Sequence, residues 1–103
     1  MTTFKEFVID AAPDQEFSTI LAGQRCTLRF RYNRTTDRWN FDLRIGDVQA
    51  VYGRRVVVGA DLLGAFPLGI GSIFAVTVDG SEPGRDAIPD RRVRVYHAAE
   101  DTA

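Results

Sequence analysis

The sequence predicts an all-β fold, a small antiparallel sandwich or a partly open barrel of about six or seven strands. Three observations support this prediction. Apolar and polar residues alternate with a period of two along much of the chain, as they do in strands with one buried face. No window of about a dozen residues carries the stripe of an amphipathic helix. Turn-forming residues, such as Gly46-Asp47 and Asp79-Gly80, separate the alternating segments.

Length and charge limit the function classes. The chain has 103 residues, 45% of them apolar and 26% charged, so we expect a single β domain over residues 1–103. Its 13 basic and 14 acidic residues nearly cancel, and the whole chain therefore lacks the positive field that drives non-specific binding to nucleic acids. Neither a signal-like start nor an apolar run of about 20 residues is present. We expect synthesis in the cytosol and no membrane partner.

Two short strands are expected before the first clear hairpin. Phe4–Ile9 and Glu16–Leu21 both alternate between apolar and polar residues. The turn Ala12-Pro13-Asp14 separates them, and Ala22-Gly23 ends the second.

The clearest element is a hairpin from Arg25 to Ile45. Its strands, Gln24–Asn33 and Trp39–Ile45, flank a turn, and every second residue in each is apolar. A slip of one residue would move a whole apolar row to the wrong face, so the register is strongly specified. The apolar pairs expected are Tyr32–Trp39, Phe30–Phe41, Leu28–Leu43 and Cys26–Ile45. The polar row pairs Arg31–Asn40, Arg29–Asp42 and Thr27–Arg44, and the ordinary interpretation of such a row is a solvated sheet face.

A further strand is expected over Val48–Val58, with a break at Gly53, where glycine permits a bend or bulge. A short helical turn is expected at Asp61–Leu63. The glycine-rich segment Ala65–Gly71 reads as a loop.

The last two strands are expected over Ser72–Val78 and Arg92–His97. Between them lies Asp79–Arg91, the longest irregular stretch, and long loops in compact domains are usually functional or mobile. The polar tail Ala98–Ala103 is expected to fray unless a partner holds it.

Few residues suggest chemistry. His97 is the only histidine and Cys26 the only cysteine, so the chain can form neither an internal disulfide nor a multi-cysteine metal site. Cys26 alternates with core residues and should behave as a small hydrophobe. No glycine-rich phosphate-binding motif is present. We therefore expect no enzyme, no cofactor and no metal; a small enzyme, the weakest alternative, would depend on His97 or Cys26.

A small oligonucleotide-binding β-barrel is the main alternative, because Arg29 to Arg34 interleaves arginines with aromatic residues. Strand alternation, however, sends Phe30 and Tyr32 to the face opposite Arg29 and Arg31. Stacking platforms need both kinds of residue on one surface, so we expect no specific nucleic acid partner.

Three successive segments resemble the small baseplate plug proteins of contractile phage tails, a family typified in cyanophages. They are Gly23–Asn33, Trp39–Leu43 and Gly53–Leu63. The resemblance continues where Arg85–Ile88 precedes Val93–Tyr96, so that it covers about Phe17 to Tyr96. Pro89 stands where the family more often has glycine, and the loop Pro67–Ser72 is particular to this chain.

The resemblance implies a structural virion protein at the distal end of the tail tube, which helps to close the lumen until contraction. It implies contacts with hub, spike and tail-tube proteins, with the tape measure protein as a further candidate, and self-association around the tail axis. The expected location is the tail baseplate of the virion, after assembly in the host cytoplasm. The interface candidates are Arg29, Arg31, Asp42, Arg44, Arg54, Arg55, Arg85 and Asp86.

Overall fold

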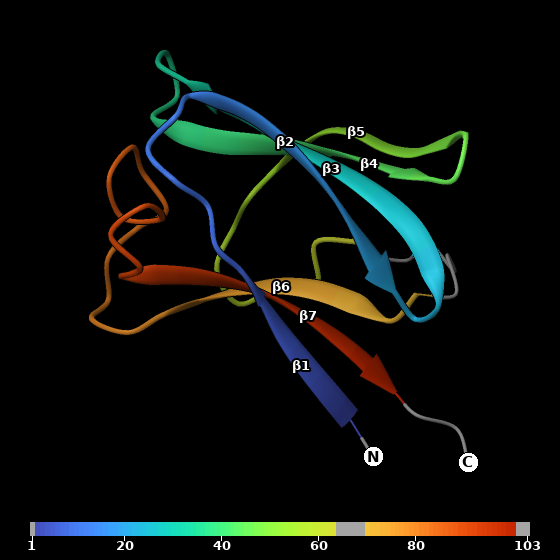
Figure 1. Ribbon diagram of the computed structural model, residues 1–103. Helices are drawn as coiled ribbons and strands as arrows, with labels where there is room; N and C mark the ends of the chain where they lie inside the picture. The colour runs from blue at the N-terminus through green and yellow to red at the C-terminus, as the bar shows by residue number, and fades with distance from the viewer. Residues whose placement is uncertain (1, 64–69, 101–103) are drawn as a thin grey trace.

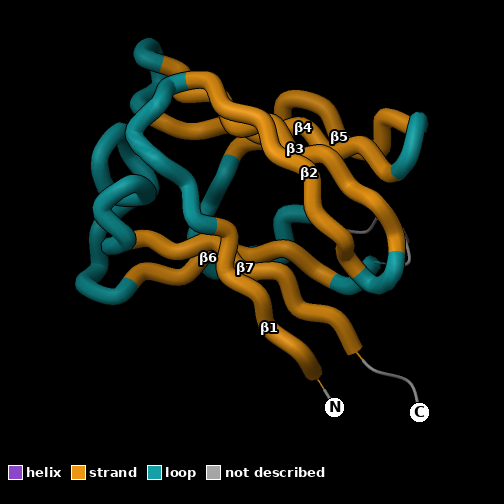
Figure 2. Tube along the Cα trace, viewed as in Figure 1, coloured by secondary structure: helices purple, strands orange, loops and turns teal. Residues whose placement is uncertain are grey.

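The computed structural model describes residues 2–63 and 70–100, and seven strands account for most of them. The strands are β1 (Thr2–Phe7), β2 (Asp14–Leu21), β3 (Gln24–Asn33), β4 (Arg38–Ile45), β5 (Val48–Arg55), β6 (Ser72–Thr77) and β7 (Val93–Glu100). No helix occurs among the described residues (Figure 2). The predicted all-β class is therefore confirmed.

The strands form two antiparallel sheets that face each other (Figure 1). The larger sheet has the order β2-β3-β4-β5, and the smaller sheet has the order β1-β7-β6. Consecutive strands pair by short turns in the larger sheet, whereas the smaller sheet joins the two ends of the chain. The arrangement is an open sandwich, one of the two architectures that the sequence predicts.

The hairpin register agrees with the prediction at every pair. Cys26 lies opposite Ile45, Phe30 opposite Phe41, and the polar row pairs in the expected order. Most apolar side chains on this face are buried, with Phe30, Trp39 and Phe41 fully enclosed, whereas Tyr32 and Ile45 are partly buried. This agreement follows from the strict alternation, because a slip of one residue would turn the aromatic rings to the solvent.

Aromatic rings connect the two sheets through the core. Phe17 of β2 stacks on Phe30 of β3 with 6.0 Å between ring centroids, and Phe30 stacks on Phe41 at 5.8 Å. Phe7, at the end of β1, lies 5.7 Å from Phe17 and brings the smaller sheet into the same row. Burial of such a ring contributes roughly 2–3 kcal/mol, so this row is a main source of stability.

Several predicted boundaries are wrong. β2 begins at Asp14 rather than Glu16, and β5 ends at Arg55 rather than Val58. Val58 instead forms an isolated parallel bridge with Ala75 of β6. β7 continues past His97 to Glu100 because β1 pairs with it, so the expectation of a frayed tail fails for residues 98–100.

The middle of the chain follows the prediction only in part. The break expected at Gly53 is present as an irregularity within one strand: the register of β5 shifts there, and Gly53 has a positive φ of 62°. Asp61–Leu63 forms a turn in which the Asp61 carboxylate accepts the Leu63 N–H at 3.0 Å. The predicted loop Ala65–Gly71 lies largely outside the described residues.

The loop between β6 and β7 is fastened to the hairpin. The indole Nε1–H of Trp39 donates to the carbonyl oxygen of Gly84 at 3.0 Å, and Arg38 forms an ion pair with Glu82 at 2.5 Å. The hairpin therefore forms the centre of the larger sheet and also holds this long loop in place.

Candidate protein-interaction face

The outer surface of the larger sheet is the best candidate for an interaction site, and we call it the polar face. Opposite residues in an antiparallel pair share a side of the sheet, so the register assigns side chains to this face. Strands β2 to β5 each contribute charged residues through their outward positions. These are Asp14, Glu16, Arg25, Arg29, Arg31, Asp42, Arg44 and Arg55.

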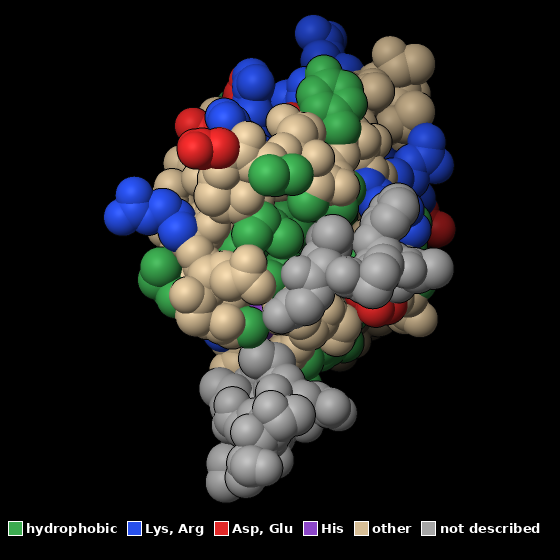
Figure 3. Space-filling model, turned by 90° about the vertical axis from the view of Figure 1, so that its right-hand side faces the viewer, with side chains coloured by type: hydrophobic (Ala, Val, Ile, Leu, Met, Phe, Trp, Pro, Cys, Tyr) green, Lys and Arg blue, Asp and Glu red, His purple; other side chains and the backbone are tan. Residues whose placement is uncertain are grey.

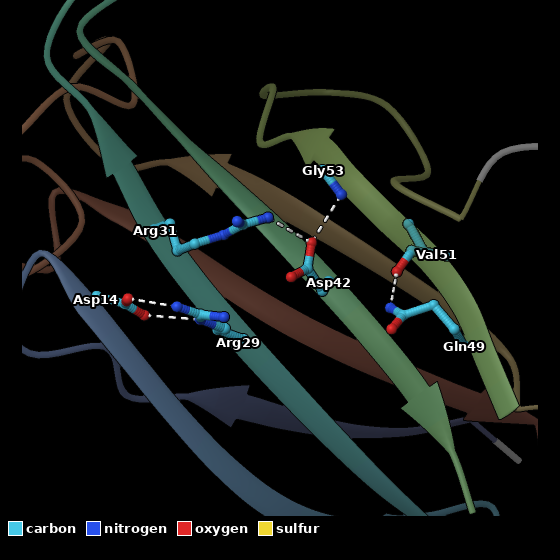
Figure 4. Close-up of polar contacts among 7 residues, drawn as sticks. All are labelled: Asp14, Arg29, Arg31, Asp42, Gln49, Val51 and Gly53. Carbon is cyan, nitrogen blue, oxygen red and sulfur yellow. Dashed lines mark hydrogen bonds and ion pairs between the residues drawn. The ribbon is translucent and has the colours of Figure 1, made fainter. Parts of the chain in front are cut away.

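Arg29 is held by a carboxylate from the neighbouring strand. Its Nε donates to Asp14 Oδ1 at 2.9 Å and its Nη2 to Asp14 Oδ2 at 2.6 Å (Figure 4). This two-bond pairing is the geometry that guanidinium and carboxylate favour. The hydrogen bond from Arg29 lowers the pKa of Asp14 below its usual value. Arg29 therefore pairs with Asp14, although Asp42 is its opposite neighbour in the register.

Asp42 lies inside the polar face rather than on it, with only 8% of its surface exposed. Its Oδ1 accepts a hydrogen bond from Arg31 Nη2 at 2.8 Å and another from the Gly53 N–H at 2.7 Å (Figure 4). The carboxylate thus ties β3, β4 and the irregular part of β5 together. A buried carboxylate with two hydrogen-bond partners of this kind has the primary role of stabilising the sheet.

Tyr52 is the exposed aromatic residue of the polar face, at 73% exposure. The Arg31 guanidinium carbon lies 5.4 Å from the centre of its ring, within the range of a cation–π contact. The two side chains border a shallow hollow of about 480 Å³. It is lined by Arg31, Tyr32, Asn33, Arg34, Asn40 and Tyr52.

Arg44 and Arg55 are the exposed and unpaired arginines among the candidates. Arg44 lies between Thr27 and Gln49 in the register, and Arg55 lies opposite Asn40. Neither forms an ion pair with any residue in the described part of the chain. Arg54 lies opposite Phe41, so its position belongs to the other side of the sheet.

Arg85 and Asp86 are separated from the polar face and lie in the loop between β6 and β7. The Arg85 guanidinium stacks over the rings of Tyr32 at 5.3 Å and Trp39 at 5.9 Å. Its Nη2 donates to the Ala11 carbonyl oxygen at 2.7 Å. Arg85 thus fastens the loop, while Asp86 is exposed at the rim of an open hollow of about 420 Å³.

An acidic side chain in the turn of the hairpin completes this fastening. Asp37 Oδ1 accepts hydrogen bonds from the Tyr32 hydroxyl at 2.5 Å and from the Arg85 N–H at 3.1 Å. These two bonds lower the pKa of Asp37. The hydrogen bond between the Tyr32 hydroxyl and Asp37 also raises the pKa of Tyr32. The β3–β4 turn and the long loop therefore form one structural unit.

The sequence candidates left out Asp14, Glu16, Arg25 and Tyr52 of the polar face, and two of these, Asp14 and Tyr52, contact its arginines. Asp14 reads as a turn residue because it follows Pro13, yet the alternation of β2 extends back to it. Tyr52 stands next to Gly53, where the irregularity in β5 disturbs the alternation. Extending the period-two alternation of β2 back by two residues would have identified Asp14. The position of Tyr52 depends on how β5 pairs with β4.

The two residues that could suggest catalysis are both in the core. Cys26 is fully buried, and burial raises the pKa of its thiol. His97 is 4% exposed, donates through Nε2 to the Ile70 carbonyl oxygen and stacks on Phe7. Among residues 2–63 and 70–100, no group of three potential metal ligands is found. The same residues include no helix that is long and apolar enough to cross a membrane.

Comparison with known protein families gives a match over most of the chain. The family model described as "Cyanophage baseplate Pam3 plug gp18" matches residues 4–100 of the chain. A search of curated proteins finds no match. The matched range includes all of the polar face and both sheets except the first two residues of β1.

Proposed function

The chain belongs to the cyanophage baseplate plug family, and from this premise we propose that it closes the distal end of a contractile tail tube, next to the hub and spike. The match over residues 4–100 carries the proposal, because it spans nearly the whole of a 103-residue chain. Baseplate membership follows from the family. The position on the tail axis and the individual neighbours are the proposed part.

The structure supports a plug in physical terms. A plug needs rigidity and several outward surfaces rather than a catalytic pocket. The paired sheets and the fastened loop supply the rigidity, and the polar face supplies a broad charged surface. Ion pairs at the rim of an interface add specificity and little affinity, so contraction could separate them.

We propose hub, spike and tail-tube proteins as partners, with the tape measure protein as a further candidate and self-association around the axis. The interface candidates divide by their surroundings. Arg29, Arg31, Arg44 and Arg55 are on the polar face and serve as its contact residues. Asp42 and Arg85 hold the fold in place and act through their neighbours, whereas Arg54 and Asp86 lie on other surfaces.

We also propose that the chain acts without catalysis. Cys26 and His97 are buried and engaged in packing or in a backbone hydrogen bond, which favours a structural role for both. Conservative replacement of each, Cys26→Ala and His97→Gln, should leave assembly unchanged in folded protein.

Copurification tests the proposed function. A tagged chain expressed during infection should elute with hub, spike and tail-tube proteins, and mass spectrometry of the eluted complex identifies them. A tagged chain that folds but elutes alone, or with replication proteins, would contradict the proposal. The second outcome would favour the oligonucleotide-binding alternative, which the exposed Tyr52 on a basic surface keeps open.

A further inference from the structure

Charge is unevenly distributed between the hairpins of the larger sheet and the rest of the chain. Residues 24–55, which include β3, β4 and β5, hold eight basic and three acidic residues, a net charge of +5. The remainder holds five basic and eleven acidic residues, a net charge of −6. Basic side chains accordingly gather in the upper half of Figure 3, where the larger sheet lies. Net neutrality therefore conceals a basic surface.

The arginines of the polar face are of two kinds, those held in an ion pair with a described residue and those without one, and Arg25 near the start of β3 belongs to the second kind. Arg29 and Arg31 are neutralised by Asp14 and Asp42 and held in fixed positions. Arg44 and Arg55 are exposed and form no ion pair with any described residue. On β4, the positions of Arg44 and of Asn40, the neighbour of Arg55, are four residues apart, roughly 13 Å. The row that holds Arg29 and Asp42 lies between the row of Arg44 and the row of Arg55, and Arg31 lies in the row of Arg55.

We propose that the polar face binds an acidic protein surface, with carboxylates of the partner pairing with Arg44 and Arg55. This inference rests on the proposed function in that the partner is another baseplate component. Arg29, in the row between those of Arg44 and Arg55, and Arg31, in the row of Arg55, supply further donors that their ion pairs already hold in position. Charge complementarity of this kind sets the orientation of the partner and speeds association.

The distribution of carboxylates favours a protein over a nucleic acid. Asp14 and Glu16 lie on the same face as the arginines, opposite Arg31 and Arg29 in the register. The phosphates of a nucleic acid form a continuous line and would pass close to these negative charges. The carboxylates of a protein partner can instead lie only opposite the arginines that have no ion pair. Tyr52 is the exposed ring on this face, with Arg31 against it, so the face presents one exposed aromatic ring and not a row of stacking platforms.

Binding of two polyanions of equal charge tests the inference. Fluorescence anisotropy at low ionic strength would compare a polyglutamate peptide with oligothymidylate on the full chain. The double variant Arg44→Glu/Arg55→Glu should weaken polyglutamate binding by about tenfold or more, because two ion pairs become two repulsions. The control Arg92→Glu/Arg94→Glu makes the same change in net charge beside the smaller sheet. It should leave the affinity within about twofold of the wild type, and circular dichroism should show both variants folded.

The results separate this inference from the proposed function. Equal weakening by both double variants, or no binding of polyglutamate by the wild type, would overturn the acidic-partner proposal. Tighter binding of oligothymidylate than of polyglutamate, lost in Arg44→Glu/Arg55→Glu, would replace it with a nucleic-acid surface. In each of these cases, copurification with tail proteins would still test the proposed function separately, because it does not depend on which face makes the contact.

Discussion

At the scale of single residues, side chains of the same type have different roles in this molecule. Arg44 is exposed and unpaired, Arg29 is exposed and paired, and Arg85 stacks on two aromatic rings. Asp42 is nearly buried, whereas Asp47 in the β4–β5 turn is exposed. The surroundings, rather than the charge, decide whether a side chain is available to a partner.

Replacement of Asp42 should destabilise the fold. Asp42→Ala leaves the Gly53 N–H and part of the Arg31 guanidinium without an acceptor inside the sheet, which should lower the free energy of unfolding by about 2–3 kcal/mol. Urea denaturation measures this change. Asp47→Ala is the control and should have an effect of less than about 0.5 kcal/mol. Equal effects of the two variants would show that the Asp42 network does not hold β5 in place.

Stability should fall in acid over a defined range. The pKa values of Glu6, Asp14 and Asp37 are lowered in the folded chain by hydrogen bonds from Arg91, Arg29 and Tyr32, respectively. The unfolded chain therefore takes up more protons than the folded chain once the pH falls below the ordinary values of 4.5 for Glu6 and 3.8 for the aspartates. Their contribution is complete above that range and is lost as the pH falls through the folded pKa values.

Thermal unfolding between neutral pH and pH 2 measures this dependence. The triple variant Glu6→Gln/Asp14→Asn/Asp37→Asn should lose less of its melting temperature between neutral pH and pH 2 than the wild type. An unchanged slope in the triple variant would assign the acid sensitivity to other groups.

At the scale of elements, alternation predicts faces well and strand ends poorly. The hairpin register was predictable because each of its rows is either wholly apolar or wholly polar. The ends of β5 and β7 were not, because Val56 is buried without continuing the strand and residues 98–100 are ordered by pairing with β1. Such ends depend on a partner strand far away in the sequence.

The long loop between β6 and β7 should depend on Arg85 in a way that charge alone does not explain. Arg85→Lys keeps the positive charge but loses the planar stack on Tyr32 and Trp39 and the bond to the Ala11 carbonyl. It should lower stability by about 1 kcal/mol and speed amide exchange over residues 79–91. Hydrogen–deuterium exchange with mass spectrometry measures the latter. Arg92→Lys is the matched control, and equal exchange in the two variants would contradict the role given to Arg85.

At the scale of the whole molecule, the fold class and the family were both predictable from one sequence. Alternation established the all-β class, and the resemblance over Phe17 to Tyr96 falls inside the matched range 4–100. The division into two sheets was not predictable, because alternation does not say which distant strands pair. The polar face was only partly predictable for the same reason: Arg29, Arg31, Arg44 and Arg55 come together, whereas Arg54 and Arg85 are placed elsewhere by pairing and by loop packing.

The proposed role of this chain is to close the tail tube as a baseplate plug. A cryo-EM map of the intact tail of a virion that carries the chain tests it most directly. We expect density for the seven-stranded sandwich on the tail axis, at the distal end of the tube and in contact with hub and spike. A resolved map of that region in which the axis is open, or is filled entirely by other chains, would contradict it.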